Sequence, residues 1–288
     1  MPALPRTLLA SLALLCSISA HATDPACPIT LDQEDPSSIR QHQEKADEGD
    51  VCAQFNLGFF HYTRQEYELS EQWYAKAAEQ GDARAAFEIA ILYRDALLPG
   101  DDSQRRQWME KSANMGLDLA QIELAIDHLE KREDQSELIT AMEWFEKAAK
   151  QNNAQAQYVL SELYWSNERG PQDMAAGDDS DPEMQRAMHF ASDNQKAAQW
   201  LCKAAMNDYP QAQYTLSEAY SIGRGDVPPS QVQRQLWLEK AAANGDEDAI
   251  NSLDTRLEAW YTTAEKWVKR QLVTEEATCP EGALEVEH

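Results

Sequence analysis

Apolar and small side chains recur three or four positions apart over most of this chain, which is the spacing of one face of an α-helix. One phrase of six residues, with tryptophan first and two small residues last, returns five times. Its copies are Trp73–Ala78, Trp108–Ala113, Trp144–Ala149, Trp200–Ala205 and Trp237–Ala242. The tryptophans are 35, 36, 56 and 37 residues apart. The pattern therefore predicts a helical repeat with a period of about 36 residues.

A second helical phrase alternates with the first. It runs from alanine to tyrosine at Ala85–Tyr93, Ala156–Tyr164 and Ala212–Tyr220, with weaker copies starting at Ala53, Ala120 and Ala249. Glycine or asparagine, which tolerate the left-handed backbone of a helix stop, follows the first phrase at Gly81, Asn114, Asn152, Asn207 and Gly245. Each repeat is therefore predicted to be an antiparallel pair of helices that packs on the next pair.

The residue pattern and the period of these phrases resemble those of the Sel1-like repeat family, which is related to the tetratricopeptide repeats. The resemblance covers Ala53 to about Leu253, and it includes the Leu57-Gly58 pair and most of a glycine turn at Tyr220–Val227. Other copies lack that turn. The resemblance implies an all-α fold, a right-handed α-solenoid of about five to six repeats with a long C-terminal capping helix. The recurring tryptophans then occupy a core position, and we expect them to pack rather than to bind a ligand.

The expected organisation has four parts. They are a leader at 1–22, an N-terminal segment with a capping helix at 23–50, the solenoid at 51–253, and a C-terminal capping helix and tail at 254–288. Ile250, Leu253, Leu257 and Trp260 mark the expected core face of the last helix. An insertion at about 167–190 breaks the repeat. Its part 170–182 has the composition of an exposed loop, and 183–190 is expected to extend the following helix backward.

The first 22 residues have the features of a secretory signal peptide. A single positive charge at Arg6 precedes an apolar stretch, and Ala20-His21-Ala22 fits the small-x-small rule for cleavage. The apolar stretch is too short to span a bilayer, and no later stretch is long enough. The sequence therefore predicts a periplasmic or secreted protein that is cleaved near Ala22.

Four cysteines follow the leader, and an even number in an exported chain suggests disulfides. Two lie near the start and two toward the end, so the natural pairing joins Cys27 to Cys52 and Cys202 to Cys279. Each bridge would tie a terminal segment to the repeats. Buried free thiols are the alternative.

The chain is strongly acidic, with 50 acidic and 25 basic residues and a net charge of −25. Such a surface repels nucleic acids and anionic membranes, whereas a basic patch on a protein or peptide partner would be attracted. A merely solubilising surface is the alternative. The sequence does not define an oligomeric state.

No pattern indicates catalysis, a cofactor or a metal. The histidines and cysteines lack ligand spacing, and there is no Gly-x-Ser-x-Gly elbow or glycine-rich phosphate loop. Ser192-Asp193-Asn194 matches one tripeptide of penicillin-recognising enzymes, some of which are relatives in this repeat family. The other motifs of those enzymes are missing. An enzyme of the β-lactamase or peptidoglycan-acting type is therefore the alternative, and not the expectation.

The sequence instead favours a protein-interaction module: a scaffold, an adaptor or an immunity protein that neutralises a toxin. Insertions in repeat arrays often decorate a binding face, although a neutral loop is the alternative. Trp165 lies outside the repeated wording and just before the insertion. The candidates for partner contact are Trp165, Asp178, Asp179, Asp181 and Glu183.

Overall fold

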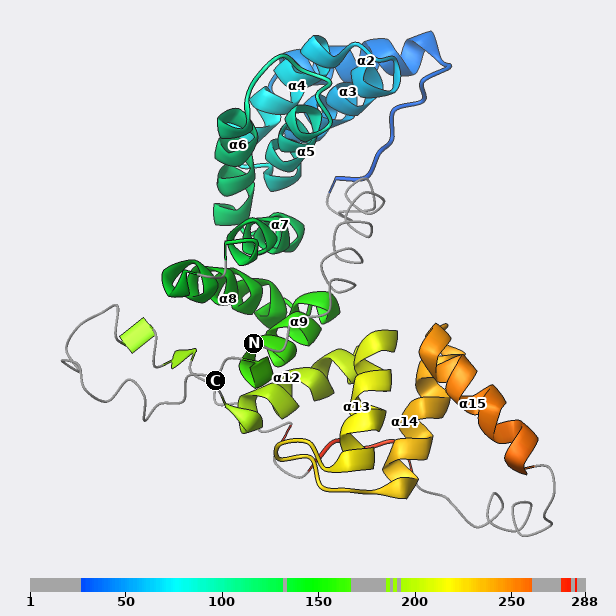
Figure 1. Ribbon diagram of the computed structural model, residues 1–288. Coiled ribbons are helices and arrows are strands. Elements are labelled where there is room, and N and C mark those ends of the chain that lie inside the picture. Colours follow the sequence, from blue (N-terminus) through cyan, green and yellow to red (C-terminus); the bar gives the residue numbers. More distant parts are fainter. Residues whose placement is uncertain are drawn as a thin grey trace. The chain divides into compact units, whose positions relative to one another are not determined.

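The computed structural model describes residues 27–131, 134–166, 185–186, 189–190, 193–260, 276–280 and 283, with the side chains of 135 and 254–260 excepted. All regular elements in these ranges are α-helices (Figure 1). The chain divides into two compact units, Met1–Glu137 and Leu138–His288. The predicted leader and the acidic insertion residues lie outside the described ranges. Among the described helices, none is long and apolar enough to cross a membrane.

The first unit holds a helix within the predicted capping segment 23–50 and the first five helices of the repeats. They are α2 (Pro36–Asp47), α3 (Val51–Thr63), α4 (Tyr67–Glu79), α5 (Ala83–Arg94), α6 (Asp102–Asn114) and α7 (Asp118–Leu129). The pairs α3 with α4 and α5 with α6 make the most extensive contacts, as the two alternating phrases predict. Alanines of the phrases are fully buried between them, among them Ala77, Ala78, Ala85 and Ala86.

The second unit contains most of α8 (Gln135–Lys150) and the remaining pairs. They are α9 (Ala154–Ser166), α12 (Asn194–Met206), α13 (Pro210–Ile222), α14 (Gln231–Ala243) and α15 (Glu247–Trp260). Helix α9 packs on α12 across the insertion, and α13 packs on α14. The inserted residues therefore interrupt the sequence of a repeat without separating its two helices. The predicted α-solenoid of antiparallel helix pairs is confirmed.

Aspartate and serine side chains begin several helices. Asp50, Asp82, Asp101, Asp193 and Ser230 each accept a hydrogen bond from a backbone N–H of the first turn. These N–H groups have no partner inside the helix, so a cap stabilises its start by about 1 kcal/mol. Because Asp193 is an extended cap residue with φ −147°, α12 does not continue backward, and the predicted extension over 183–190 is wrong.

The predicted helix stops are partly correct. Gly81, Asn152 and Gly245 have the expected positive φ. In the other two turns the left-handed residue comes later, at Gly116 (φ 101°) and Asp208 (φ 57°), because Asn114 is still helical and Asn207 caps its helix with φ −85°. Asparagine identity alone does not fix which turn residue adopts the left-handed backbone.

A buried side-chain amide links consecutive helices in four repeats. In each, a glutamine of the first helix donates to a carbonyl at the end of the preceding helix, and the four bonds are Gln54 to Ala46, Gln121 to Ala113, Gln157 to Ala149 and Gln213 to Ala205. Three of these amides also accept a bond from the end of the following helix, from Gln80, Asn207 and Asn244. The glutamine thus satisfies carbonyls that a helix end leaves open and joins three helices at once.

The repeated tryptophans pack as expected. Trp237 is fully buried and Trp200 nearly so, whereas Trp73, Trp108 and Trp144 are half-buried. In all five copies the lysine three residues later places its ammonium over the indole ring, at 3.5 to 5.2 Å from the ring centroid. The Trp-x-x-Lys spacing therefore covers each indole with a cation–π contact.

The last described helix differs from the prediction in one position. Leu253 packs against Leu238 and Ala249, as expected for the core face. Ile250 is 39% exposed, because Ala249 occupies the inward position next to it. The side chains of the other predicted core residues, Leu257 and Trp260, lie outside the described part of the chain, and so do residues 261–275.

Candidate functional site

Each end of the described chain is an extended segment joined to a helix by a disulfide. Cys27 is bonded to Cys52 of α3, and Cys202 of α12 is bonded to Cys279, with Cα atoms 5.3 and 5.8 Å apart. This is the pairing that the sequence suggests. We call residues 27–31 the N-terminal strap and residues 276–280 the C-terminal strap.

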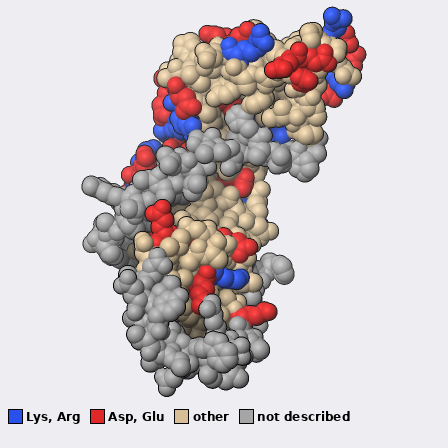
Figure 2. All heavy atoms as spheres, turned by 90° about the vertical axis from the view of Figure 1, so that its right-hand side faces the viewer, with Lys and Arg blue, Asp and Glu red and all other residues tan. Residues whose placement is uncertain are grey.

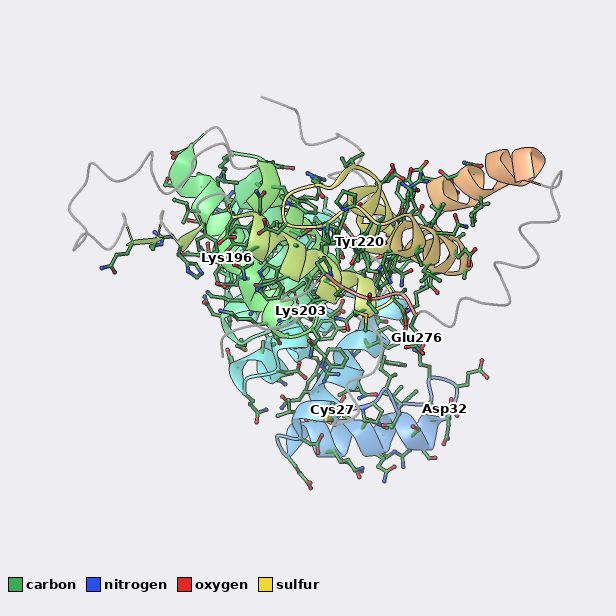
Figure 3. All side chains as sticks on the ribbon, turned by 90° about the horizontal axis from the view of Figure 1, so that it is seen from below. Cys27, Asp32, Lys196, Lys203, Tyr220 and Glu276 are labelled. Atoms are coloured by element: carbon green, nitrogen blue, oxygen red, sulfur yellow. A yellow bond between two sulfur atoms is a disulfide. The ribbon has the colours of Figure 1, made fainter. Side chains whose placement is uncertain are left out.

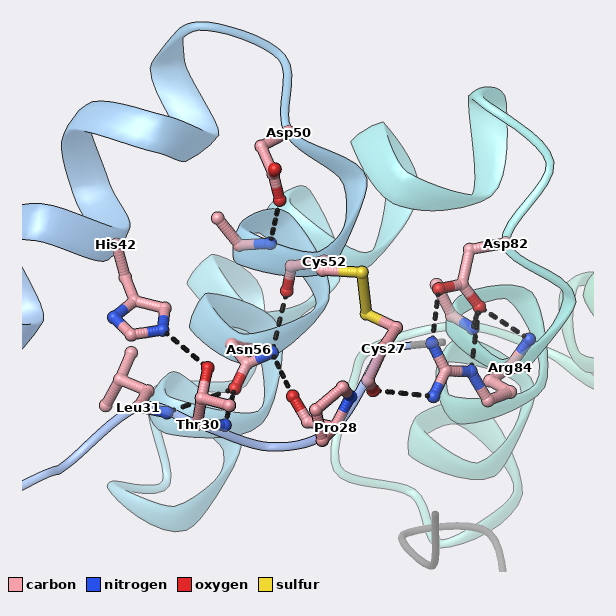
Figure 4. Close-up of a disulfide and its surroundings, with 12 residues drawn as sticks. Cys27, Pro28, Thr30, Leu31, His42, Asp50, Cys52, Asn56, Asp82 and Arg84 are labelled. Atoms are coloured by element: carbon pink, nitrogen blue, oxygen red, sulfur yellow. Dashed lines mark hydrogen bonds and ion pairs between the residues drawn. A yellow bond between two sulfur atoms is a disulfide. The ribbon is translucent and has the colours of Figure 1, made fainter. Parts of the chain in front are cut away.

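The N-terminal strap is held mainly by the side chain of Asn56 (Figure 4). The Asn56 Oδ1 atom accepts the backbone N–H of Thr30 at 2.8 Å and of Leu31 at 3.2 Å. Its Nδ2 atom donates to the carbonyl of Pro28 at 3.2 Å. One side-chain amide thus satisfies three backbone groups of a segment without regular secondary structure.

A second side chain, Arg84 of α5, binds the start of the same strap. Its Nη1 atom donates to the carbonyl of Cys27 at 3.2 Å. The guanidinium is held in place by two hydrogen bonds to Asp82 and lies over the ring of Phe55, 4.4 Å from its centroid. The strap therefore spans two repeats of the first unit.

The C-terminal strap is bound to α13 and α14 in a similar way. The Gln233 amide donates to the carbonyl of Glu276 at 3.2 Å and accepts the N–H of Thr278 at 2.7 Å. The Tyr220 hydroxyl and the Trp237 indole N–H both donate to the carbonyl of Thr278 at 2.9 Å. Figure 3 labels Tyr220 and Glu276 where the strap meets the helices. The strap accordingly shields the last tryptophan of the repeat series.

Trp165, a candidate for partner contact, lies at the end of α9 and is half-buried. The guanidinium of Arg224 stacks on its ring at 3.9 Å and also pairs with Glu162 at 3.4 Å. The indole Nε1 is buried, and no hydrogen-bond partner for it is found in the described part of the chain. A side-chain atom on Gly225 would lie 2.9 Å from this nitrogen. The observed contacts of Trp165 are thus with its own chain.

The other four candidates, Asp178, Asp179, Asp181 and Glu183, lie outside the described residues. The described residues that follow them contact α8 and α9. Arg186 makes a bidentate ion pair with Glu143, at 2.6 and 2.8 Å, and the buried Phe190 stacks on Tyr164. The end of the insertion is therefore attached to α9 of its own repeat and to α8 of the repeat before it.

Glu88 of α5 is a buried carboxyl group that the sequence does not single out. It is only 3% exposed, and burial raises its pKa to about 7, against an opposing effect of Arg84 and Arg94. Because the folded state holds the proton more tightly than the unfolded chain, this group stabilises the fold fully below pH 4.5. That stability is lost as the pH rises through 7.

A Glu88→Gln variant should remove this pH dependence. Since one pKa unit corresponds to about 1.4 kcal/mol, the variant should gain about 2.5 kcal/mol of stability relative to the natural protein as the pH rises from 5 to 8. Urea unfolding at both pH values, followed by circular dichroism, measures the difference. A constant difference between the two proteins would contradict the assignment. Glu110→Gln, on the exposed surface of α6, is the control.

The charged surface of the first unit is mixed in sign. On the face shown in Figure 2, basic side chains lie among the acidic ones. Several acids are paired, as in the contacts of Arg105 with Asp102 and Asp127 at 2.6 and 2.7 Å. At these positions the negative charge of the acidic side chains is therefore partly neutralised by neighbouring basic side chains.

The described residues contain no group of three or more His, Cys, Asp or Glu side chains placed to hold a metal ion. Asp193, from the tripeptide of penicillin-recognising enzymes, caps α12 through bonds from Gln195 and Lys196, and Ser192 lies outside the described ranges. A surface depression of about 400 Å³ is lined by Asp102, Ser103, Arg106, Gln107 and Glu110 of α6. The Ser103 hydroxyl in this lining donates to the carboxylate of Asp101, which caps α6.

The holding side chains Asn56, Arg84 and Gln233 were not predicted from the sequence. Asn56 carries a weak signal, because it is a polar residue in the otherwise apolar phrase Phe55–Phe60. Gln233 and Arg84 carry none, because polar residues are ordinary near the start of an exposed helix.

Comparison with known proteins identifies the repeat. The family model described as Sel1 repeat matches residues 53–82, 83–117, 119–153, 188–209 and 210–246, which together make up more than half of the chain. Four of the matched segments each cover a helix pair, whereas 188–209 covers α12 alone. The gap at 154–187 holds α9 and most of the insertion.

Two known proteins are similar to short segments of this chain, and a solved structure is similar over most of it. A 67-residue segment is 40% identical to a chitin synthase regulator of Saccharomyces cerevisiae, covering 23% of this chain and 10% of that protein. An 85-residue segment is 30% identical to a sel1-like repeat-containing protein of Acanthamoeba polyphaga mimivirus, covering 30% and 16%. The matches thus span no more than about a sixth of either relative. A crystal structure of a Sel1 repeat protein from Oxalobacter formigenes has the same fold, with a TM-score of 0.54 and 19% identity over 87% of this chain and 85% of that one.

Proposed function

The chain belongs to the Sel1 repeat family, and from this premise we propose that it is an exported module that binds other proteins. The observation that carries the proposal is the way in which side chains of the first unit hold the backbone of an extended segment, the N-terminal strap. A repeat array that binds its own chain in this manner has the chemistry to bind another.

The predicted leader and the two disulfides support a location in the periplasm or outside the cell, since disulfides persist in oxidising compartments. The roles open to such a module are scaffold, adaptor or toxin-neutralising immunity protein. The similarity to a regulator of a synthase is consistent with action on another protein, although it covers a tenth of that regulator. The net charge of −25 favours a partner with a basic surface.

Affinity capture tests the proposal. The chain without residues 1–22, immobilised at low salt once with its disulfides intact and once after reduction, should retain a partner from a periplasmic extract, to be identified by mass. A matched bait lacking 170–182 tests the insertion with its acidic residues, and loss of the partner would assign the contact to Asp178, Asp179 and their neighbours. Retention of nothing above an unrelated helical bait would contradict the proposal, and a partner that is insensitive to salt would contradict its electrostatic part.

A further inference from the structure

The N-terminal strap is recognised chiefly through its backbone. Four hydrogen bonds join backbone groups of residues 27, 28, 30 and 31 to the side chains of Asn56 and Arg84. Every residue except proline offers these N–H and C=O groups. The four bonds therefore require a backbone that turns so that the N–H groups of two consecutive residues point to one acceptor, and they do not require the sequence of the strap.

Two side chains of the strap add selectivity. Leu31 is buried in an apolar cluster with Ala46, Ala53, Leu57 and Phe60. The Thr30 hydroxyl lies 3.1 Å from His42 Nε2. Between Pro28 and Thr30, Ile29 is 38% exposed and contributes little to recognition. The site thus has one pocket for an aliphatic side chain and a polar contact beside it.

The holding side chains are fixed by contacts that do not involve the strap. Asn56 also donates to the carbonyl of Cys52 at 2.8 Å, one turn earlier in α3. Arg84 is oriented by Asp82, which is itself the cap of α5. Because these contacts belong to the helices, the donors and acceptors keep their positions when the strap leaves. Such preorganised groups lower the cost of binding a new segment.

We propose that this site is a recognition site for an extended peptide of a partner protein, and that the strap is its built-in occupant, locked by Cys27–Cys52. The partner segment has non-proline residues at the places of Thr30 and Leu31 and an aliphatic side chain at the second. The proposal rests on the function proposed above and names the kind of segment bound.

Release of the lock is a two-electron reduction. A dithiol reductant breaks the bond between the two sulfur atoms, leaves thiols on Cys27 and Cys52, and becomes a disulfide itself. The strap then remains attached to α2 through a few residues and competes as an intramolecular ligand at high effective concentration. A partner segment displaces the strap only when the bonds of the strap to the site are weakened, or when the partner segment makes stronger bonds to the site.

A peptide titration of the full mature chain tests this inference. The probe is a labelled synthetic peptide with the sequence of residues 27–33 and serine in place of Cys27. The opened protein carries Cys27→Ser, Cys52→Ser and Leu31→Asp, so that the strap is neither locked nor able to fill the pocket. We expect saturable binding, measured by fluorescence anisotropy, and at least tenfold weaker binding to the oxidised natural protein.

Three controls make the result specific. A probe with proline at the Thr30 place and a probe with aspartate at the Leu31 place should each bind at least tenfold more weakly. Asn56→Leu in the opened protein should abolish binding, whereas Gln235→Leu in the second unit should not change it. If Asn56→Leu does not fold by circular dichroism, Arg84→Lys replaces it, because lysine lacks the fork held by Asp82.

A folded, opened protein that does not bind the probe would overturn the inference, as would equal binding of the proline probe. Capture of a partner by the oxidised bait together with failure of the peptide would remove this site and leave the proposed function standing. Failure of both experiments would remove the proposed function as well.

Discussion

Replacing Trp237 by alanine should lower the free energy of unfolding of the second unit by about 3–5 kcal/mol. Trp237 is fully buried in a cluster with Leu201, Leu216 and Tyr220. The substitution leaves a large cavity, and the surrounding helices can close it only in part. The carbonyl of Thr278 keeps its bond from the Tyr220 hydroxyl, so the loss is mainly one of packing.

Trp108→Ala is the matched control for this prediction. Trp108 occupies the same position of its repeat, but it is half-exposed and covered by Lys111. Its removal should cost about 1–2 kcal/mol, because less apolar area returns to water. Urea unfolding followed by circular dichroism at fixed pH compares the two variants. Equal losses would mean that the C-terminal strap does not bury the last tryptophan as the structure indicates.

Removing the Cys202–Cys279 disulfide should destabilise the protein by about 4 kcal/mol, and removing Cys27–Cys52 by about 3 kcal/mol. The first closes a loop of 77 residues and the second a loop of 25. A longer loop restricts the unfolded chain more, which accounts for the order of the two effects. The variants are Cys279→Ser and Cys27→Ser, each at the strap end of its bridge.

Thermal and urea unfolding of both variants, with and without a reductant, measure these losses. The reductant should affect each variant less than the natural protein, because one bridge is already missing. A variant that keeps the natural stability would contradict the contribution of its bridge. Non-reducing peptide mapping of the natural protein gives the control on the pairing itself.

The fold could be predicted from the sequence because its signals repeat. One tryptophan phrase is a weak signal, but five copies define helix pairs and their order, because they are 35 to 37 residues apart except across the insertion and alternate with an alanine phrase. The small residues predict close packing, and Gly58 shows how close, since a side-chain atom there would lie 2.4 Å from the ring of Tyr74. Helix ends are less predictable, as the turns at Gly116 and Asp208 show, because several turn residues can adopt the left-handed backbone.

The straps could be predicted only in part. Cysteine positions indicated that both ends are tied to the repeats, since spacing along the chain limits the pairings. The residues that hold the straps, Asn56 and Gln233, act on backbone groups far away in sequence, and no local pattern reports such a contact. Trp165 was expected to contact a partner because it lies outside the repeated phrases. Its stacking with Arg224 could not be predicted, because Arg224 lies in a turn 59 positions later in the chain.

A titration of the mature chain, in both its oxidised and its reduced form, with the captured and purified partner tests the central claim most directly. We predict saturable binding at one site, with an affinity that falls as the salt concentration rises and with no chemical change in the partner. Absence of saturable binding at every salt concentration, or conversion of the partner into a product, would contradict the account of this protein as a binding module.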